Sequence, residues 1–209
     1  MKKLIPYKTV RGALAALDNG GRFYNLFSRA GDGLITAGEL SKATGRLSNL
    51  RQSALYFEMM LMELNEADRE TVVARLDPTL RRKFRRSRPQ KLEPSALGGA
   101  VGGKNGIIVE GQVIYSRSQE KFSSFVMIPI QSGSVTTYMM LPIYEQFSMY
   151  QFKGAGDAPI PVAISKKAAR LPSGVVRLGG FIREASSSDT EPDKSAGYFS
   201  VDYLSLLER

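Results

Sequence analysis

Oxygen-bearing side chains recur at a regular spacing in residues 28–39, which read SRAGDGLITAGE. If Ser28 is counted as the first position, Asp32 is the fifth, Thr36 the ninth and Glu39 the twelfth. Hydroxyl and carboxylate oxygens spaced in this way along one loop could surround a hard cation such as calcium, which takes roughly six to eight oxygen ligands. The candidate metal ligands are therefore Ser28, Asp32, Thr36 and Glu39.

This segment, with the residues that flank it, resembles an EF-hand over about 25 residues. Gly33 falls at the sixth position, where such a loop turns sharply, and Ile35 at the eighth, where a short strand forms. The resemblance has two departures, because Ser28 stands where an Asp is usual and Ala30 has no side-chain oxygen. Thr36 and Glu39 also form a capping box, which starts a helix without any ion. We expect a helix-loop-helix centred on Gly33 that binds calcium weakly or not at all, and no other cofactor.

A second candidate site is the basic segment at residues 81–91, RRKFRRSRPQK, which contains no acidic residue. Cations clustered in this way favour an anionic partner, namely phosphates, an anionic membrane surface or an acidic protein. The alternative is a solvated helix end, where cations interact favourably with the negative pole of the helix dipole. The candidate anion-binding residues are Arg81, Arg82, Lys83, Arg85, Arg86, Arg88 and Lys91.

The charge of the chain is divided unevenly between its two halves. Residues 1–91 contain 18 Lys and Arg against 9 Asp and Glu, whereas residues 92–209 contain 11 of each. The whole net charge of +9 therefore lies in the first half. An anionic partner should meet the basic segment first.

The composition excludes several kinds of chemistry. The chain has no cysteine and no histidine, which removes disulfides, zinc fingers, iron–sulfur clusters, thiol catalysis and the commonest general base near neutral pH. The glycine-rich stretch at residues 98–104 does not match the spacing of a phosphate-binding loop. We therefore expect a protein that is not an enzyme.

The fold class expected from the pattern is α+β, with a helical bundle followed by a small β-barrel. Residues 1–91 are expected to form a helical domain, with the apolar helix at residues 48–64 at its centre. Asn65 and the pair Asp77-Pro78 are helix-start signals for the two helices that follow. Helices are also expected at residues 10–17, 22–27 and 37–44.

Residues 92–106, LEPSALGGAVGGKNG, are expected to be a linker, because they contain five glycines and a proline. Residues 107–209 are then expected to be a β domain. Strand patterns occupy residues 107–115, 122–130, 135–143, 161–164, 175–183 and 198–207, with a hairpin turn between the second and third at residues 131–134, and a short helix is expected at residues 145–152. This order of strands with one short helix resembles the OB-fold, although a generic small barrel or sandwich remains the alternative.

Two interpretations of function follow. The first is a binding protein that engages nucleic acid through its basic helical half, with the barrel assisting. The second is a protein–protein interaction or scaffold module with an EF-hand-like bundle and no nucleic-acid role, whose partner could be an acidic protein. An OB-like domain does not decide between them, because its half of the chain is neutral and fold alone does not select a ligand. The chain has neither a secretory signal nor a run of 18 apolar residues, so we expect a cytoplasmic protein without a transmembrane segment.

Overall fold

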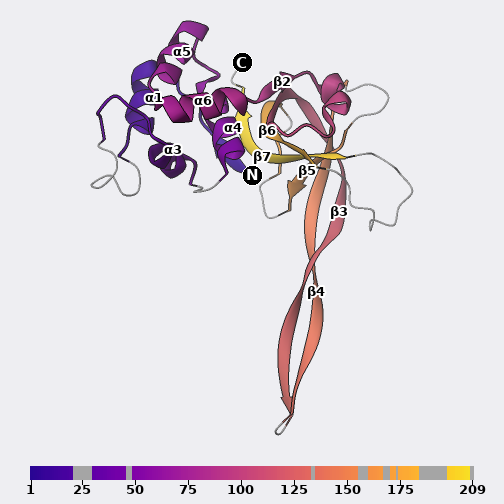
Figure 1. The fold of residues 1–209 in the computed structure, drawn as a ribbon. Coiled ribbons are helices and arrows are strands. Elements are labelled where there is room, and N and C mark those ends of the chain that lie inside the picture. Colours follow the sequence, from indigo (N-terminus) through magenta and orange to yellow (C-terminus); the bar gives the residue numbers. More distant parts are fainter. Residues whose placement is uncertain are drawn as a thin grey trace.

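A computed structural model of the 209-residue chain describes residues 1–20, 30–45, 49–132, 135–154, 160–166, 170–172, 174–183 and 197–207. The helical part contains α1 (Val10–Leu17), α3 (Ala37–Thr44), α4 (Leu50–Leu61), α5 (Glu66–Ala74) and α6 (Pro78–Arg86). The strands are β1 (Lys2–Leu4), β2 (Gln90–Leu92), β3 (Ile107–Ser132), β4 (Val135–Phe152), β5 (Val162–Ser165), β6 (Val175–Arg183) and β7 (Tyr198–Leu206), and a 3-10 helix, η1, covers Pro94–Ala100. Figure 1 shows the helices on one side of a sheet from which β3 and β4 project as a long hairpin. The expected α+β class is confirmed.

Helices α3, α5 and α6 begin at the cap residues that the sequence predicts, because a side-chain oxygen there accepts an N–H that the helix leaves unpaired. Helix α4, predicted at residues 48–64, is shorter and begins after Asn49. Asn65 accepts the N–H of Asp68 at the start of α5, and Asp77 accepts those of Thr79 and Leu80 at the start of α6. Thr36 and Glu39 form the expected capping box at α3. The helix predicted at residues 22–27 lies outside the described residues.

Helix α4 is the centre of the helical core, as its apolar sequence predicts. Leu55, Phe57, Met59 and Leu61 are all buried, in one core cluster with side chains from α1, α3, α5 and α6. Phe57 meets Phe84 of α6 edge to face, with ring centroids 4.9 Å apart. This contact anchors α6, the basic helix, to the middle of the bundle.

The strands form one seven-stranded sheet in which each of the five strands β3 to β7 pairs with two others of these five. Strand β3 pairs with β4, β4 with β5, β5 with β7, β7 with β6, and β6 with β3. The β5–β7 pair is parallel and the other four pairs are antiparallel. The short strands β1 and β2 pair in parallel with β7 and β3 respectively.

The first part of the chain, expected to be a helical domain over residues 1–91, also contains the strand β1, which pairs with β7 of the C-terminal sheet. One expectation for local structure is wrong: the short helix predicted at residues 145–152 instead forms the end of β4. Pairing with β3 on one side and β5 on the other decides the conformation there, and a local pattern does not reveal such partners.

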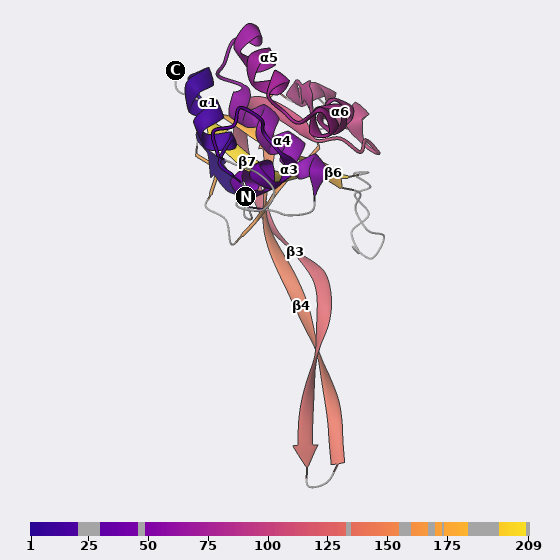
Figure 2. The same cartoon turned by 60° about the vertical axis from the view of Figure 1, so that its left-hand side comes forward.

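The helical part and the sheet share a close contact where α4 crosses β6. A Cβ atom built at Gly179 would lie 2.1 Å from the sulfur of Met59, so the absence of a side chain allows the helix to approach. Tyr56 and Tyr203 meet edge to face nearby, with centroids 5.8 Å apart. The glycine-rich segment between the halves contains η1, whose Leu97 is buried in the core of the sheet. Figure 2 shows the helices packed against the strands on this side.

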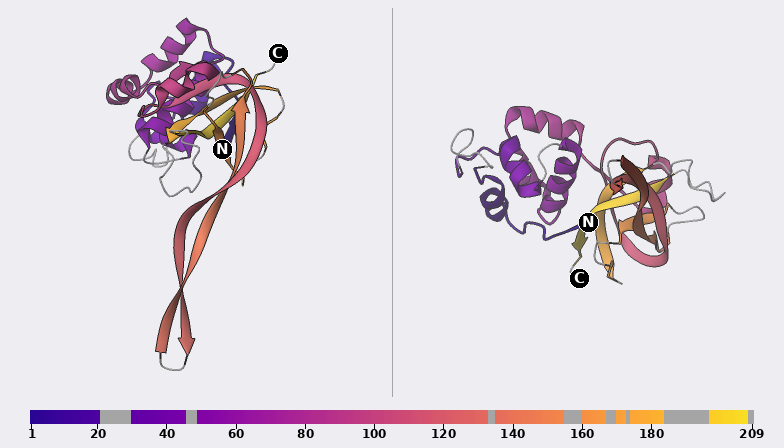
Figure 3. Two further views of the ribbon diagram at one scale, coloured as in Figure 1. Left: turned by 90° about the vertical axis from the view of Figure 1, so that its right-hand side faces the viewer. Right: turned by 90° about the horizontal axis from the view of Figure 1, so that it is seen from below.

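The far part of the β3–β4 hairpin, residues 119–146, is here called the arm. Within it β3 and β4 pair only with each other, since the pairs to β6 end at Gln112 and those to β5 at Phe147. Fourteen residues of β3 extend over roughly 45 Å at about 3.3 Å per residue. Apart from a backbone hydrogen bond from Lys166 to Gln146 at its base, no other described segment lies beside the arm in Figures 1 and 2 and in the left panel of Figure 3. The hairpin predicted around residues 131–134 is confirmed, but it is much longer than the sequence pattern indicates.

Among the described helices, none is both long enough and apolar enough to span a membrane.

Candidate anion-binding surface

Helix α6 is fixed in orientation by two buried side chains on one face. Leu80 and Phe84, four residues apart, point into the helical core. With about 100° between successive residues, Arg82 and Arg86 lie one turn apart on the opposite face, flanked by Lys83 and Arg85. These four cations are exposed and together occupy the outer half of the helix.

These four side chains have no hydrogen-bond or ion-pair partner among the described residues. Three of them, Lys83, Arg85 and Arg86, lie in the last turn of α6, where the helix dipole stabilises a positive charge. The dipole offsets part of their mutual repulsion. It does not supply a counter-charge for the row as a whole, so the surface that Arg82, Lys83, Arg85 and Arg86 form, here called the α6 surface, is available to an external anion.

The other three predicted anion-binding residues have contacts within the protein. The guanidinium of Arg81 donates to the carbonyl oxygen of Ala74 at 3.4 Å. Arg88 pairs with Glu58 of α4 at 3.2 Å, and the hydrogen bond and charge of this carboxylate raise the pKa of Arg88. These two residues therefore also help to hold α6 in place. Arg81 lies near the start of α6 and Arg88 two residues beyond its end, and neither belongs to the row on the outer face of the helix.

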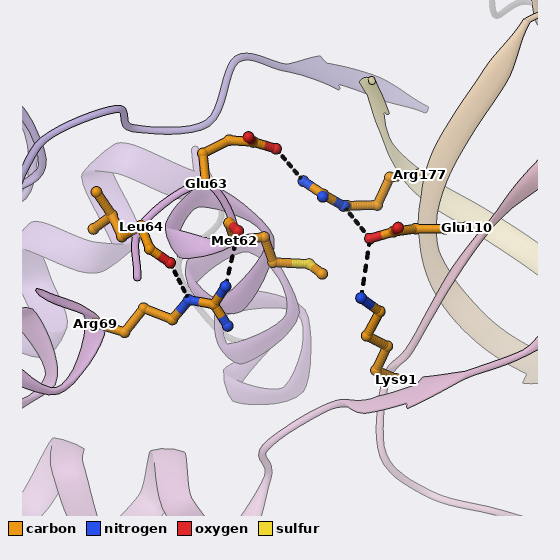
Figure 4. Close-up of polar contacts among 7 residues, drawn as sticks. All are labelled: Met62, Glu63, Leu64, Arg69, Lys91, Glu110 and Arg177. Carbon is orange, nitrogen blue, oxygen red and sulfur yellow. Dashed lines mark hydrogen bonds and ion pairs between the residues drawn. The ribbon is translucent and has the colours of Figure 1, made fainter. Parts of the chain in front are cut away.

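The seventh residue, Lys91, belongs to an ion-pair network at the junction between the helices and the sheet (Figure 4). Its ammonium lies 3.4 Å from Glu110 of β3. The same carboxylate accepts from Arg177 of β6 at 2.8 Å, and Arg177 donates to Glu63, at the end of α4, also at 2.8 Å. The Arg177 side chain is only 7% exposed, whereas Glu63 and Glu110 are 43% and 28% exposed. One buried guanidinium thus joins the helical part to the sheet.

The network lowers the pKa of Glu110. Burial acts to raise the pKa of this carboxyl, but the hydrogen bond and charge of Arg177, together with Lys91, outweigh burial and hold the pKa below its usual value of 4.5. Arg69 of α5 lies next to the network and donates to the carbonyl oxygens of Leu64 and Met62 at 2.8 Å (Figure 4). These bonds satisfy carbonyl groups in the turn between α4 and α5, and so fix α5 relative to the end of α4.

The EF-hand-like loop is organised by a residue that the sequence pattern did not single out. Both carboxylate oxygens of Asp18 accept backbone N–H groups, from Gly31 and Gly33, each at 2.7 Å. Asp32 accepts the N–H of Leu34, a local turn contact. Gly33 has a φ of +82°, as the expected sharp turn at the sixth position requires. Among the candidate ligands, Ser28 lies outside the described residues.

Glu39 is fully buried and its carboxylate is already engaged. One oxygen accepts the N–H of Gly20 at 2.7 Å, and the other accepts the N–H and the hydroxyl of Thr36 at 2.8 and 2.9 Å. A metal would have to displace these donors. Within the described chain, no three acidic side chains converge as a set of metal ligands.

The loop is also tied to the base of the α6 surface. Ile35 forms a parallel bridge with Leu76, because the N–H of Ile35 donates to Arg75 at 2.7 Å and the N–H of Asp77 donates to Ile35 at 2.9 Å. Asp77 is the cap of α6, so the bridge connects the loop directly to the start of the basic helix. No sequence signal identifies this pairing, since the partners are about 40 residues apart and the bridge is one residue long.

A search of known protein families finds no family that matches the chain, and a search of curated proteins finds no similar protein. The chemistry of the surfaces described above is therefore the basis for inferring a function.

Proposed function

We propose that this chain is a cytoplasmic, non-enzymatic binding protein that holds an anionic polymer, nucleic acid in the first place, on the α6 surface. The observation that carries the proposal is the row formed by Arg82, Lys83, Arg85 and Arg86, which is exposed and has no counter-charge among the described residues. Like charges crowded on one helix repel each other, and a polyanion relieves this repulsion.

The expected mode of binding is contact with phosphates and not with bases. Arginine presents a planar fork of donors that matches phosphate oxygens, and each phosphate that is neutralised releases bound counterions. The turn between α5 and α6 has only three residues, a length found in helix-turn-helix pairs. The N-terminal end of α6, where such a helix reads bases, instead carries Asp77, Pro78 and Thr79. Binding should therefore be strongly salt-dependent and largely independent of sequence.

In this proposal the remaining parts of the chain hold α6 in position. We propose that β3 to β7 form a small barrel of the OB type, and the evidence for it is that the pairs between these five strands follow a cyclic order. We propose also that the loop around Gly33 is an EF-hand-like turn that holds the start of α6 through the Ile35–Leu76 bridge, with calcium bound weakly or not at all.

The test is a fluorescence anisotropy titration with mixed-sequence single- and double-stranded oligonucleotides at low salt. The test variant changes Arg82, Lys83, Arg85 and Arg86 to Gln. The matched control removes the same charge from four exposed cations of the neutral half and changes Lys104, Lys153, Lys166 and Arg170 to Gln. We expect the test variant to lose most of the affinity and the control variant to keep most of it.

Two results would overturn the proposal: no binding of either oligonucleotide by the wild-type protein, or equal losses in the two variants. The titration is then repeated with polyglutamate as an acidic protein chain. Binding to polyglutamate but not to nucleic acid would indicate that the α6 surface binds an acidic protein. The exposed arm favours a role in protein–protein interaction independently of this result.

A further inference from the structure

The arm concentrates the exposed apolar side chains of the chain. Of the fourteen large apolar side chains that are exposed among the described residues, nine lie on the arm, where they are 40–63% exposed. They occupy its outer part, residues 126–128 and 138–144, which contains no charged residue. A soluble protein seldom leaves such a patch uncovered, and a two-stranded ribbon without other support is marginally stable in water. The arm therefore has the composition of a contact surface.

Both faces of the ribbon are apolar. Neighbouring residues of a strand point to opposite faces, and residues opposite each other in register share a face. Met127 pairs with Met140, and Pro129 with Tyr138, which together form one face. The other face is formed by Val126, Ile128, Met139, Leu141 and Ile143.

The two edges of the arm are less suited to contact than its faces. Ser132 pairs with Val135, so two residues connect the strands and the closing pair is of the hydrogen-bonded kind. Counting alternate pairs back from it places Pro129 and Pro142 at non-hydrogen-bonded pairs, where the backbone nitrogen points outward. A proline there removes a donor from each outer edge, which blocks the addition of a further strand at that point. The register therefore favours packing by faces over strand addition.

We propose that the arm is the self-association element of this protein and that copies of the chain pack arm on arm through both faces. The nine side chains expose on the order of 900 Å² together, so burying both faces would cover an area per chain close to the roughly 800 Å² of a standard interface. One face alone would cover only about half of that area and would leave the other apolar face in water. Each arm then lies between the arms of two other copies, and the assembly contains more than two chains.

The distribution of charge favours a second copy of the chain as the partner that covers the arm. The arm carries one Lys and two Glu, all in its inner part, so two arms can approach without strong repulsion. The helical half carries the whole +9, and bodies brought together directly would repel each other. An arm of roughly 45 Å places the contact several Debye lengths away from that charge. The same near-neutral composition gives a polyanion no reason to bind there, and a lone hairpin in lipid would leave the polar groups of both edges without partners.

The test is sedimentation velocity of the full chain from about 1 to 100 µM, with two arm variants that each alter one face. The first changes Met127 and Tyr138 to Thr, and the second changes Ile128 and Leu141 to Thr. Threonine suits a strand, so the hairpin itself should persist, and circular dichroism checks that the body is folded. The control changes Ile5 and Leu34, two exposed apolar residues of the body, to Thr.

We expect the wild-type protein to form species heavier than a dimer of the 23.0-kDa chain, and both arm variants to shift the association to at least tenfold higher concentration. The control should associate like the wild type. Added salt should change the association little, because the arm keeps the charged bodies several Debye lengths apart, whereas it weakens binding to a polyanion. The two proposals can therefore fail separately.

Several results would overturn the proposal. A wild-type protein that stays monomeric over the whole range would do so, and co-sedimentation of that monomer with phosphatidylcholine vesicles would assign the arm to lipid instead. Association that neither arm variant weakens would place the contact elsewhere. Association that only one of the two variants weakens would exclude packing through both faces.

Discussion

The ion-pair network around Arg177 allows a test of what holds the helical part on the sheet. The perturbation is the double change Glu63→Gln and Glu110→Gln, which leaves the guanidinium in place and removes both carboxylate charges. Each of its two 2.8 Å bonds is charge-assisted and about twice as strong as a neutral one, so the change should lose about 1 kcal/mol per bond. The uncompensated charge on a side chain that is 7% exposed adds to this loss.

We expect a total loss of about 2–3 kcal/mol in the free energy of unfolding. This is less than the roughly 3–5 kcal/mol for breaking a fully buried pair, because Glu63 and Glu110 are 43% and 28% exposed. The converse change, Arg177→Met, should cost about 1 kcal/mol or less, because methionine fills the buried space and the carboxylates can turn toward water. The double variant should be the less stable of the two, because it leaves a buried charge without a partner, whereas Arg177→Met leaves only the partly exposed carboxylates unpaired.

The assay is urea unfolding followed by far-ultraviolet circular dichroism. With a slope of roughly 1–3 kcal/mol per molar urea, the double variant should unfold at about 1 M less urea than the wild type. Glu93→Gln, an exposed change outside the network, is the control and should shift the midpoint little. The reasoning is refuted if Arg177→Met destabilises the protein more than the double variant does.

The same network predicts a dependence on pH. Since the pKa of Glu110 is lower in the folded state than its usual value of 4.5, its contribution to stability is complete above that pH. The contribution is lost as the pH falls through the lower, folded value. The difference in stability between the wild type and Glu110→Gln should therefore narrow in acid and be constant near neutrality.

Three further predictions concern other parts of the chain. Gly179→Val should destabilise the fold by about 2 kcal/mol in thermal unfolding, because the side chain would overlap a methionine sulfur of α4; Gly174→Val, where the space is open, should be tolerated. Glu39→Gln should lower the midpoint of unfolding equally with and without calcium, and calorimetry showing micromolar calcium affinity for the wild type would contradict the account of this loop. Changing Pro129 and Pro142 to Thr should restore an edge donor on each strand and increase thioflavin-positive aggregation; unchanged aggregation would argue against the role assigned to the edges.

Much of the local structure could be predicted from the sequence, because it depends on near neighbours. The caps at Thr36, Asn65 and Asp77 bond to residues two or three positions away, so their side chains and spacing suffice. Strand β6 has the predicted bounds, and β7 differs by one residue, because both have alternating or continuous apolar runs bounded by turn residues. The apolar sequence of α4 likewise predicted its central place.

The remaining features depend on partners that are distant in the sequence. Asp18 organises a loop 13 to 15 residues away, and Arg177 joins groups 67 and 114 residues away, which no short window of sequence contains. The arm was predicted as a short hairpin because residues 116–121 are polar and those at 125–130 are continuously apolar, so neither stretch alternates. Of the seven predicted anion-binding residues, composition alone could not separate the four on the outer face from Arg81, Arg88 and Lys91, which have contacts within the protein.

The most direct test of the central proposal is the slope of the logarithm of the binding constant for a mixed-sequence duplex against the logarithm of the salt concentration, between about 50 and 200 mM. Each phosphate contact contributes about −0.9 to this slope. We predict that the wild-type slope is steeper by about three to four units than that of the variant in which Arg82, Lys83, Arg85 and Arg86 are Gln. Equal slopes for the two proteins, or no binding by the wild type at the lowest salt, would contradict the assignment of the α6 surface as a polyanion site.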